Sequence, residues 1–160
     1  MSTQTSKEDR FSVHYRHTQL GYVTATATAI LAGMVITYSI FMSEEGQLGL
    51  DGIALTSGLG LLTVLFSSLT TEVTDQEFQF YFGPGFWTRT FPLDTIRSVE
   101  VVRNPIWYGW GIRYTPAGWL YNVSGRSAVE LDLGSEGTIR VGTDEPELLA
   151  RALRQAMEAA

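Results

Sequence analysis

The chain lacks cysteine, contains a single lysine and has few charged residues of either sign. Without cysteine, disulfide bonds, thiolate nucleophiles and cysteine-ligated zinc sites are excluded. Charged residues make up 18% of the chain and the formal net charge is −6, so capture of nucleic acid by a basic surface is not expected. With 160 residues, of which 44% are hydrophobic, the chain is predicted to fold as one domain with an accessory element.

Two long uncharged segments explain the scarcity of charge. Residues 20–42 contain no Asp, Glu, Lys, Arg or His, and residues 52–71 form a second uncharged run. At about 1.5 Å per residue, the first segment extends about 35 Å as a helix, which exceeds the hydrocarbon core of about 30 Å. A buried soluble hairpin would need a larger surrounding domain, and a signal peptide has a shorter apolar core. We therefore predict a membrane helical hairpin, with transmembrane helices over 20–42 and 52–71 and a short external loop over 43–51.

The basic residues near these segments predict their orientation. Lys7, Arg10 and Arg16 precede the first segment, Arg89 follows the second, and the connecting loop has no basic residue. Lysine and arginine close to a span tend to stay in the cytoplasm. The N-terminal segment 1–19 and the C-terminal domain are therefore both predicted to be cytoplasmic.

Small residues recur along both segments. They are Gly21, Ala25, Ala29 and Gly33 in the first, and Gly52, Thr56 and Gly60 in the second. Such faces let membrane helices approach closely, through van der Waals packing and hydroxyl hydrogen bonds. Two interpretations stay open: the two faces pack on each other within one chain, or they form a homodimer. Neither segment contains an ionisable residue, so no proton or ion path is predicted.

The remaining residues, 72–160, have the pattern of a small β domain. Residues 77–82 alternate so that three phenylalanines share one face, and Gly83-Pro84-Gly85 turns the chain into a second strand. Strands are predicted over 77–82, 86–91, 98–103, 111–115, 119–124, 128–133 and 138–141. We therefore expect about seven antiparallel strands with one buried face.

A C-terminal helix over 145–158 is predicted to close this domain. Asp144 can cap the helix, because its carboxylate can accept a hydrogen bond from the first turn. Leu149, Leu153 and Met157 fall four residues apart and form one apolar face. Since such a helix has little stability of its own in water, it is expected to cover part of the β domain.

Several segments of this domain carry a family resemblance. They are residues 104–113 (NPIWYGWGIR), 118–122 (GWLYN), 124–125 (SG), 128–131 (AVEL) and 139–146 (IRVGTDEP). Together they resemble the pleckstrin-homology-like (PH-like) domains of bacterial membrane proteins, over about residues 70 to 157. The resemblance implies a PH-like β-barrel or sandwich capped by a C-terminal helix, after two transmembrane helices in the bacterial inner membrane. That group is mostly uncharacterised, so the resemblance implies fold and location more than function.

The chain departs from the eukaryotic members of this fold at their lipid site. Their phosphoinositide site uses clustered lysine and arginine near the first hairpin, where this chain has Glu72, Asp75 and Glu77. Carboxylates repel a phosphorylated head group. Phosphoinositide binding is therefore not expected here.

The densest aromatic segment supplies the candidate binding residues, Trp107, Tyr108 and Trp110, with Arg113 just beyond. In one interpretation the segment presents Trp107 and Tyr108 to a partner or to the bilayer interface, where amphipathic rings are favoured. In the other, the tryptophans pack into the core and the glycines between them serve turn geometry. If the segment is extended, Trp107 and Tyr108 point in opposite directions, and at least one of them is exposed.

The sequence contains no signature of catalysis or metal binding. His14 and His17 lie three residues apart before the first span without further ligands nearby, so they are expected to be interfacial residues only. No Ser-His-Asp arrangement and no acid-base pair is indicated, so no cofactor, no metal and no enzymatic activity are predicted. We expect a membrane-anchored binding or assembly module that recruits a protein partner at the inner membrane. The alternative is a lipid- or small-ligand-binding domain that senses the membrane.

Overall fold

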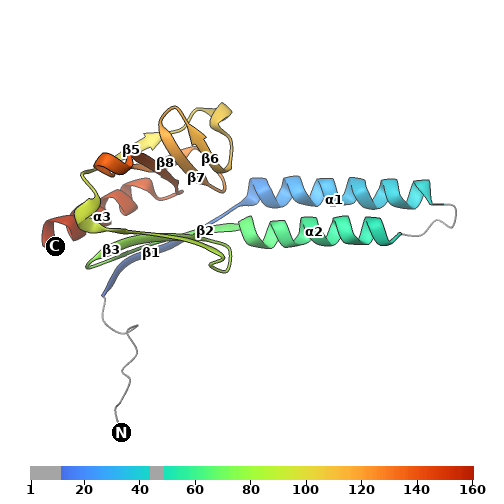
Figure 1. Cartoon of the computed structure of the whole chain (residues 1–160), viewed down its shortest axis with the longest axis horizontal. Coiled ribbons are helices and arrows are strands. Elements are labelled where there is room, and N and C mark those ends of the chain that lie inside the picture. The colour runs from blue at the N-terminus through green and yellow to red at the C-terminus, as the bar shows by residue number, and fades with distance from the viewer. Residues whose placement is uncertain (1–11, 44–48) are drawn as a thin grey trace, which may run out of the picture.

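The computed structural model describes residues 12–43 and 49–160, which form nine strands and three α-helices (Figure 1). The strands are β1 (Val13–Leu20), β2 (Ser68–Thr74), β3 (Glu77–Phe82), β4 (Trp87–Pro92), β5 (Ser98–Arg103), β6 (Gly111–Thr115), β7 (Gly118–Asn122), β8 (Ser127–Asp132) and β9 (Thr138–Gly142). The α-helices are α1 (Tyr22–Met42), α2 (Leu50–Phe66) and α3 (Pro146–Ala159), and short 3₁₀ helices are η2 (Leu93–Thr95), η3 (Ile106–Tyr108) and η4 (Gly134–Glu136). Lys7, Arg10 and residues 44–48 of the predicted external loop lie outside the described residues.

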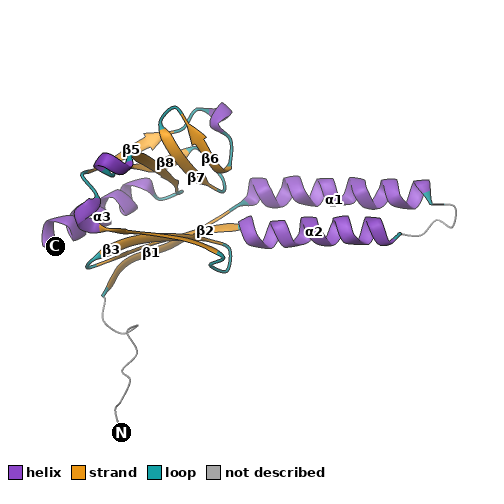
Figure 2. Cartoon of the chain, in the orientation of Figure 1, coloured by secondary structure: helices purple, strands orange, loops and turns teal. Residues whose placement is uncertain are grey.

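The strands form two open sheets, with the orders β1-β2-β3-β4 and β5-β8-β9-β7-β6. Every pair is antiparallel except β7–β9, which is parallel. The sheets share one apolar core, in which the ring centroids of Phe80 on β3 and Tyr121 on β7 lie 4.8 Å apart. Figure 2 shows the two sheets on one side of the molecule and two long helices on the other. The architecture is a mixed α/β fold, and the described strands form no closed barrel, which corrects that part of the sequence-based prediction.

The seven predicted strands correspond to β3 through β9, and the structure adds β1 and β2. The prediction had placed residues 13–19 in a separate N-terminal segment and residues 68–71 in the second span, and the structure corrects both. Ser68–Thr74 is rich in threonine, whose β-branched side chain suits a strand. Its backbone pairs with β1 on one side and β3 on the other. An uncharged stretch therefore ends as a strand and not as a helix.

Strands β1 and β2 continue directly into the two long helices. Gly21 separates β1 from α1, Ser67 separates α2 from β2, and the Gly21 amide donates to the Ser67 carbonyl at 2.6 Å. A Cβ atom on Gly21 would lie 3.0 Å from the Phe66 carbonyl oxygen and 3.1 Å from that of Ser67, so the crossing leaves little room for a side chain. The paired strands and the paired helices form one long antiparallel element (Figure 1).

Helix α1 has the length and hydropathy needed to cross a membrane. It contains 21 residues, its most apolar window has a mean hydropathy of 1.7, and none of its residues is buried. Helix α2 is equally apolar but has only 17 residues. Among the described helices, α1 is thus the one that meets the usual length for a span.

The small-residue faces make only part of the contact between α1 and α2. Thr63 donates a hydrogen bond to Thr28 at 2.7 Å, and Gly52 is buried. A Cβ atom on Gly33 or Gly60 would meet nothing within 4 Å. These two glycines therefore do not serve helix contact within the described chain, and their role stays a prediction.

Helix α3 covers the core between the two sheets. Leu149, Leu153 and Ala156 are buried, and the helix contacts β1, β2, β5 and β8. It begins at Pro146, and Glu145 precedes it without a side-chain hydrogen bond to the first turn. The predicted cap by Asp144 is wrong, because its carboxylate contacts His17 on β1 instead.

Candidate functional site

The loop that carries the predicted binding residues, 104–110, is fixed at its base. The Asn104 side chain is buried, and its Oδ1 accepts a hydrogen bond from the Arg140 guanidinium at 3.0 Å. The Asn104 backbone N–H donates to the Arg126 backbone carbonyl at 2.7 Å, and the Arg126 side chain donates to the Asn104 backbone carbonyl at 3.1 Å. The chain then makes the turn η3 and leaves it at Gly109, whose φ of +63° favours glycine.

The structure brings Trp107, Tyr108, Trp110 and Arg113 into one loop and strand but gives them different surroundings. Trp107 is 79% exposed and points away from the core. Tyr108 is half-buried, with its ring centroid 6.0 Å from the Arg140 guanidinium carbon. The Trp110 indole donates to the Gly125 carbonyl at 3.0 Å, and Arg113 donates to the Trp110 carbonyl at 2.6 Å. The loop is thus held at its ends and presents Trp107 outward.

A second exposed aromatic pair lies on the neighbouring strand edge. Tyr114 on β6 and Trp119 on β7 are direct cross-strand partners, and their rings meet edge to face at 5.6 Å. Tyr114 is 73% exposed because β6 is the last strand of its sheet. Sequence reasoning did not single out Tyr114, since only the strand register shows that it stands opposite Trp119.

Arg89 on β4 connects this aromatic surface to the other sheet. Burial raises the pKa of Tyr121, and the nearby Arg89 partly offsets this by lowering it. Tyr121 also contacts Trp119, with ring centroids 6.4 Å apart. Because β4 and β6 are terminal strands of their sheets, the backbone on this side of the domain is open to further pairing.

The two histidines form carboxylate contacts on β1. His14 binds Asp75, and this hydrogen bond lowers the pKa of the Asp75 carboxyl. His17 contacts Asp144 at 2.6 Å and Glu145 at 3.4 Å, ahead of α3. Both histidines belong to strand β1, and their expected place at the membrane interface stays a prediction. Among the described residues, no group of three or more His, Asp or Glu side chains is arranged to hold a metal ion.

Tyr15 lies beside this histidine contact and joins β1 to the start of α3. Its hydroxyl donates to the Glu145 carboxylate at 3.3 Å. Burial, with the charge of Glu145 as a second cause, raises the pKa of Tyr15. The phenol therefore stays neutral well above neutral pH, as its hydrogen bond requires.

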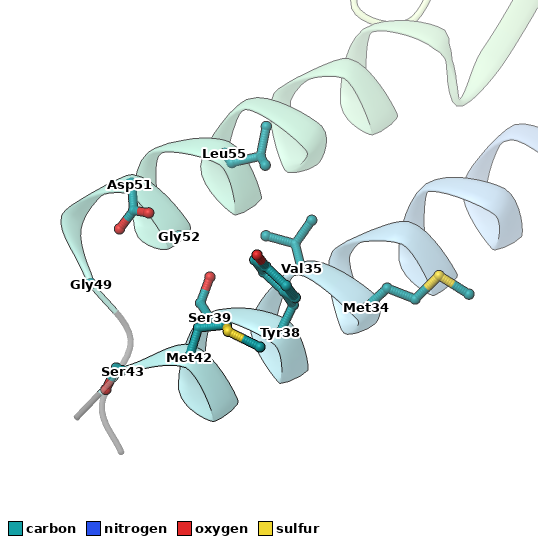
Figure 3. Close-up of a pocket in the computed structure, with 10 residues that line it drawn as sticks. All are labelled: Met34, Val35, Tyr38, Ser39, Met42, Ser43, Gly49, Asp51, Gly52 and Leu55. Carbon is teal, nitrogen blue, oxygen red and sulfur yellow. The ribbon is translucent and has the colours of Figure 1, made fainter. Parts of the chain in front are cut away.

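Three hollows lie along the long helices in the described part of the chain. One, of about 550 Å³, lies along α1 beside Met34 and Phe41. Another, of about 520 Å³, lies between the helix ends far from the domain, and its polar side chains include Tyr38, Ser39 and Asp51 (Figure 3). The smallest, of about 260 Å³, lies where the helices meet the β domain, and Trp110 lines it.

No protein-family model matches the sequence, and a comparison with curated proteins found no match.

Proposed function

We propose that the protein is a membrane-anchored PH-like module that recruits a protein partner at the cytoplasmic face of the bacterial inner membrane. In this proposal α1 and α2 both cross the bilayer as a helical hairpin, and both termini are cytoplasmic. The role is binding and assembly, without an enzymatic reaction.

The membrane anchoring is supported by what surrounds the two helices. α1 has no buried residue, and Gly52 is the only buried residue of α2. Helices that are apolar all round and uncovered by protein need an apolar solvent. At about 1.5 Å per residue, α2 extends about 26 Å, so it crosses by thinning the bilayer locally or with help from flanking residues.

The recruitment of a protein is supported chiefly by Trp107. Trp107 is 79% exposed, so a large apolar area of its side chain contacts water. This contact costs free energy unless a partner covers the ring. Its loop is fixed through Asn104, so little conformational entropy is lost when a partner binds. Tryptophan is also among the residues that contribute most to binding energy at protein interfaces.

Photo-crosslinking from position 107 tests this proposal in the full chain and in its native membrane. A photoreactive amino acid replaces Trp107, and the matched control carries it at Leu148, an exposed apolar residue of α3 that is 48% accessible. We expect a discrete captured polypeptide from position 107 and not from position 148. Trp107→Ala should weaken co-purification of that polypeptide by about tenfold or more, whereas Leu148→Ala should leave it unchanged.

Three results would contradict the proposal. One is capture of the same polypeptides from both positions. Another is capture of lipid alone from position 107. The third is co-purification that survives Trp107→Ala.

A further inference from the structure

The smallest of the hollows along the long helices, here called the junction pocket, lies between these helices and the β domain. Its volume is about 260 Å³. The principal side chains around it are Thr24 and Thr28 of α1, Leu62 and Phe66 of α2, and Trp110 and Val123 of the domain. The pocket is therefore bounded on one side by the proposed membrane helices and on the other by the cytoplasmic domain. Figure 1 shows how the two helices meet the strands at this junction.

The domain holds the rim of the junction pocket in place. Thr24 contacts the Val123 carbonyl at 3.3 Å, and Ser124 donates a hydrogen bond to the Leu20 carbonyl at 2.8 Å. The Trp110 indole closes the same rim through its hydrogen bond to the Gly125 carbonyl. The walls of the pocket are therefore held in fixed positions by these hydrogen bonds.

Two arginines lie close to this rim without lining the pocket. Arg113 donates to the Trp110 carbonyl at 2.6 Å. Arg126 follows Gly125, the acceptor of the Trp110 indole, and its Nε donates to the Asn104 carbonyl at 3.1 Å, which leaves its other N–H groups for a further acceptor. Both side chains are exposed. A guanidinium carries five N–H donors, so the bond to Trp110 leaves Arg113 with donors for a further acceptor.

The positive charge of these two arginines is not balanced by ion pairs. Within residues 12–43 and 49–160, neither Arg113 nor Arg126 forms an ion pair with a carboxylate, in contrast to Arg140 with Glu130. Arg103 adds a third cation at this end, because it pairs in register with Ser127 just after the turn. Asp144 and Glu145, which follow β9, contact His17, and Glu130 contacts Arg140.

Several carboxylates of the domain lie at the other end of the sheets. Asp75 lies in the turn after β2, Asp132 ends β8, and Glu136 lies in the turn between β8 and β9. The domain is acidic as a whole, but Arg113 and Arg126 have no carboxylate partner among the described residues. An anion is therefore favoured at the rim of the junction pocket.

We infer that the junction pocket binds an anionic phospholipid of the cytoplasmic leaflet, with an acyl chain beside Leu62 and Trp110 and its phosphate held by Arg113 and Arg126. Basic sites next to membrane helices on the cytoplasmic side favour anionic head groups, and a guanidinium binds phosphate oxygens in a bidentate manner. A lipid fits better than a soluble anion, because one side of the pocket belongs to helices proposed to lie in hydrocarbon. This inference rests on the proposed membrane anchoring but not on the protein partner.

Native mass spectrometry of the full chain in detergent tests the inference, with phosphatidylglycerol and phosphatidylcholine of identical acyl chains as the probes. We expect one phosphatidylglycerol to be retained about tenfold more strongly than phosphatidylcholine. Arg113→Gln with Arg126→Gln should remove this preference. The matched control is Arg97→Gln with Arg151→Gln, which removes two exposed arginines elsewhere on the domain and should keep the preference.

A variant that fills the pocket tests whether lipid binding needs the pocket itself as well as the charge of the arginines. Leu62→Trp should lower retention of both lipids, whereas Leu61→Trp, on the same helix but outside the pocket, should not. Equal retention of the two lipids by the wild type would overturn the inference. So would a preference that survives either the double arginine change or Leu62→Trp. Extraction of the chain from membranes by alkaline carbonate is measured first, because release there would contradict the anchoring itself and not the lipid site.

Discussion

At the scale of single residues, the position of His14 and His17 on strand β1 gives them hydrogen-bond partners that the sequence did not indicate. Before a membrane helix they had no partner in the sequence, but in the sheet each meets a carboxylate from a distant part of the chain. His17 contacts the residues just ahead of α3, so β1 is joined to the start of the C-terminal helix by a hydrogen bond as well as by packing. Such partners could not be inferred from spacing, because Asp75 lies 61 residues from His14 and Asp144 lies 127 residues from His17.

The His14–Asp75 contact predicts how stability depends on pH on the acid side. The hydrogen bond from His14 lowers the pKa of Asp75 in the folded chain below its value in the unfolded chain. Asp75 therefore contributes stability above the unfolded pKa of about 3.9, and this contribution is lost as the pH falls through the folded pKa. Asp75→Asn should flatten the decline in thermal unfolding temperature of the full chain below about pH 4.

The contribution is small because Asp75 is exposed to solvent. Asp94→Asn is the control, since Asp94 is also an exposed carboxylate and forms no ion pair within the described chain. An unchanged acid profile in Asp75→Asn, or an equal flattening in Asp94→Asn, would contradict this role.

At the scale of elements, β3 through β9 and α3 were predictable from sequence, because alternating apolar residues and glycine turns mark strands directly. The phenylalanines of β3 show this well, since Phe78, Phe80 and Phe82 are all fully buried on one face. β1 and β2 were missed because they adjoin the uncharged helices without proline or a glycine-rich turn. A segment that is recognised only by its lack of charged residues can be the end of a helix or a threonine-rich strand, and this criterion does not distinguish the two.

The sequence predicted which segment contains the candidate site, but it did not predict how the side chains of that segment are arranged. The sequence brought Trp107, Tyr108 and Trp110 together, and the structure keeps them in one loop. Which ring is exposed depends on the 3₁₀ turn η3, whereas the opposite directions predicted for Trp107 and Tyr108 applied only to an extended segment. The pairing of Tyr114 with Trp119 depends on strand register, which no local pattern encodes.

Two glycines from the small-residue faces give a matched test of the helix contacts. Gly21→Ala should destabilise the chain by about 1–3 kcal/mol, because a Cβ atom there meets two backbone carbonyl oxygens of the α2–β2 junction. Gly33→Ala should be neutral or stabilise by up to about 1 kcal/mol, because it adds helix propensity in open space. The free energy of unfolding of the full chain in detergent micelles measures both changes.

The opposite ranking of the two glycines would be informative. Destabilisation by Gly33→Ala would place this glycine at a tight contact with a second copy of the chain, as the homodimer interpretation requires. Tolerance of Gly21→Ala would show that the junction between strands and helices is looser than described.

At the scale of the whole molecule, the continuous element of β1, α1, α2 and β2 fixes the domain relative to the helices. Hydrogen bonds from Gly21 to Ser67 and from Ser124 to Leu20 join the parts at the junction, and Phe66 packs on Phe82 and Phe86. With the proposed membrane anchoring, a partner on the Trp107 loop would therefore be held in a defined position relative to the membrane. The unpaired arginines at the helix-facing end are consistent with the same orientation, because cations favour the anionic cytoplasmic surface.

The proposed topology is tested most directly by single-cysteine labelling, which the natural absence of cysteine makes free of background. Leu50→Cys places the thiol at the start of α2, where the side chain is 86% exposed, and Ser135→Cys places it in an exposed turn of the domain. In intact bacterial spheroplasts, a membrane-impermeant maleimide should label Leu50→Cys at once and Ser135→Cys only after lysis. Labelling of Ser135→Cys in intact spheroplasts, or of Leu50→Cys only after lysis, would contradict a cytoplasmic domain anchored by two spans.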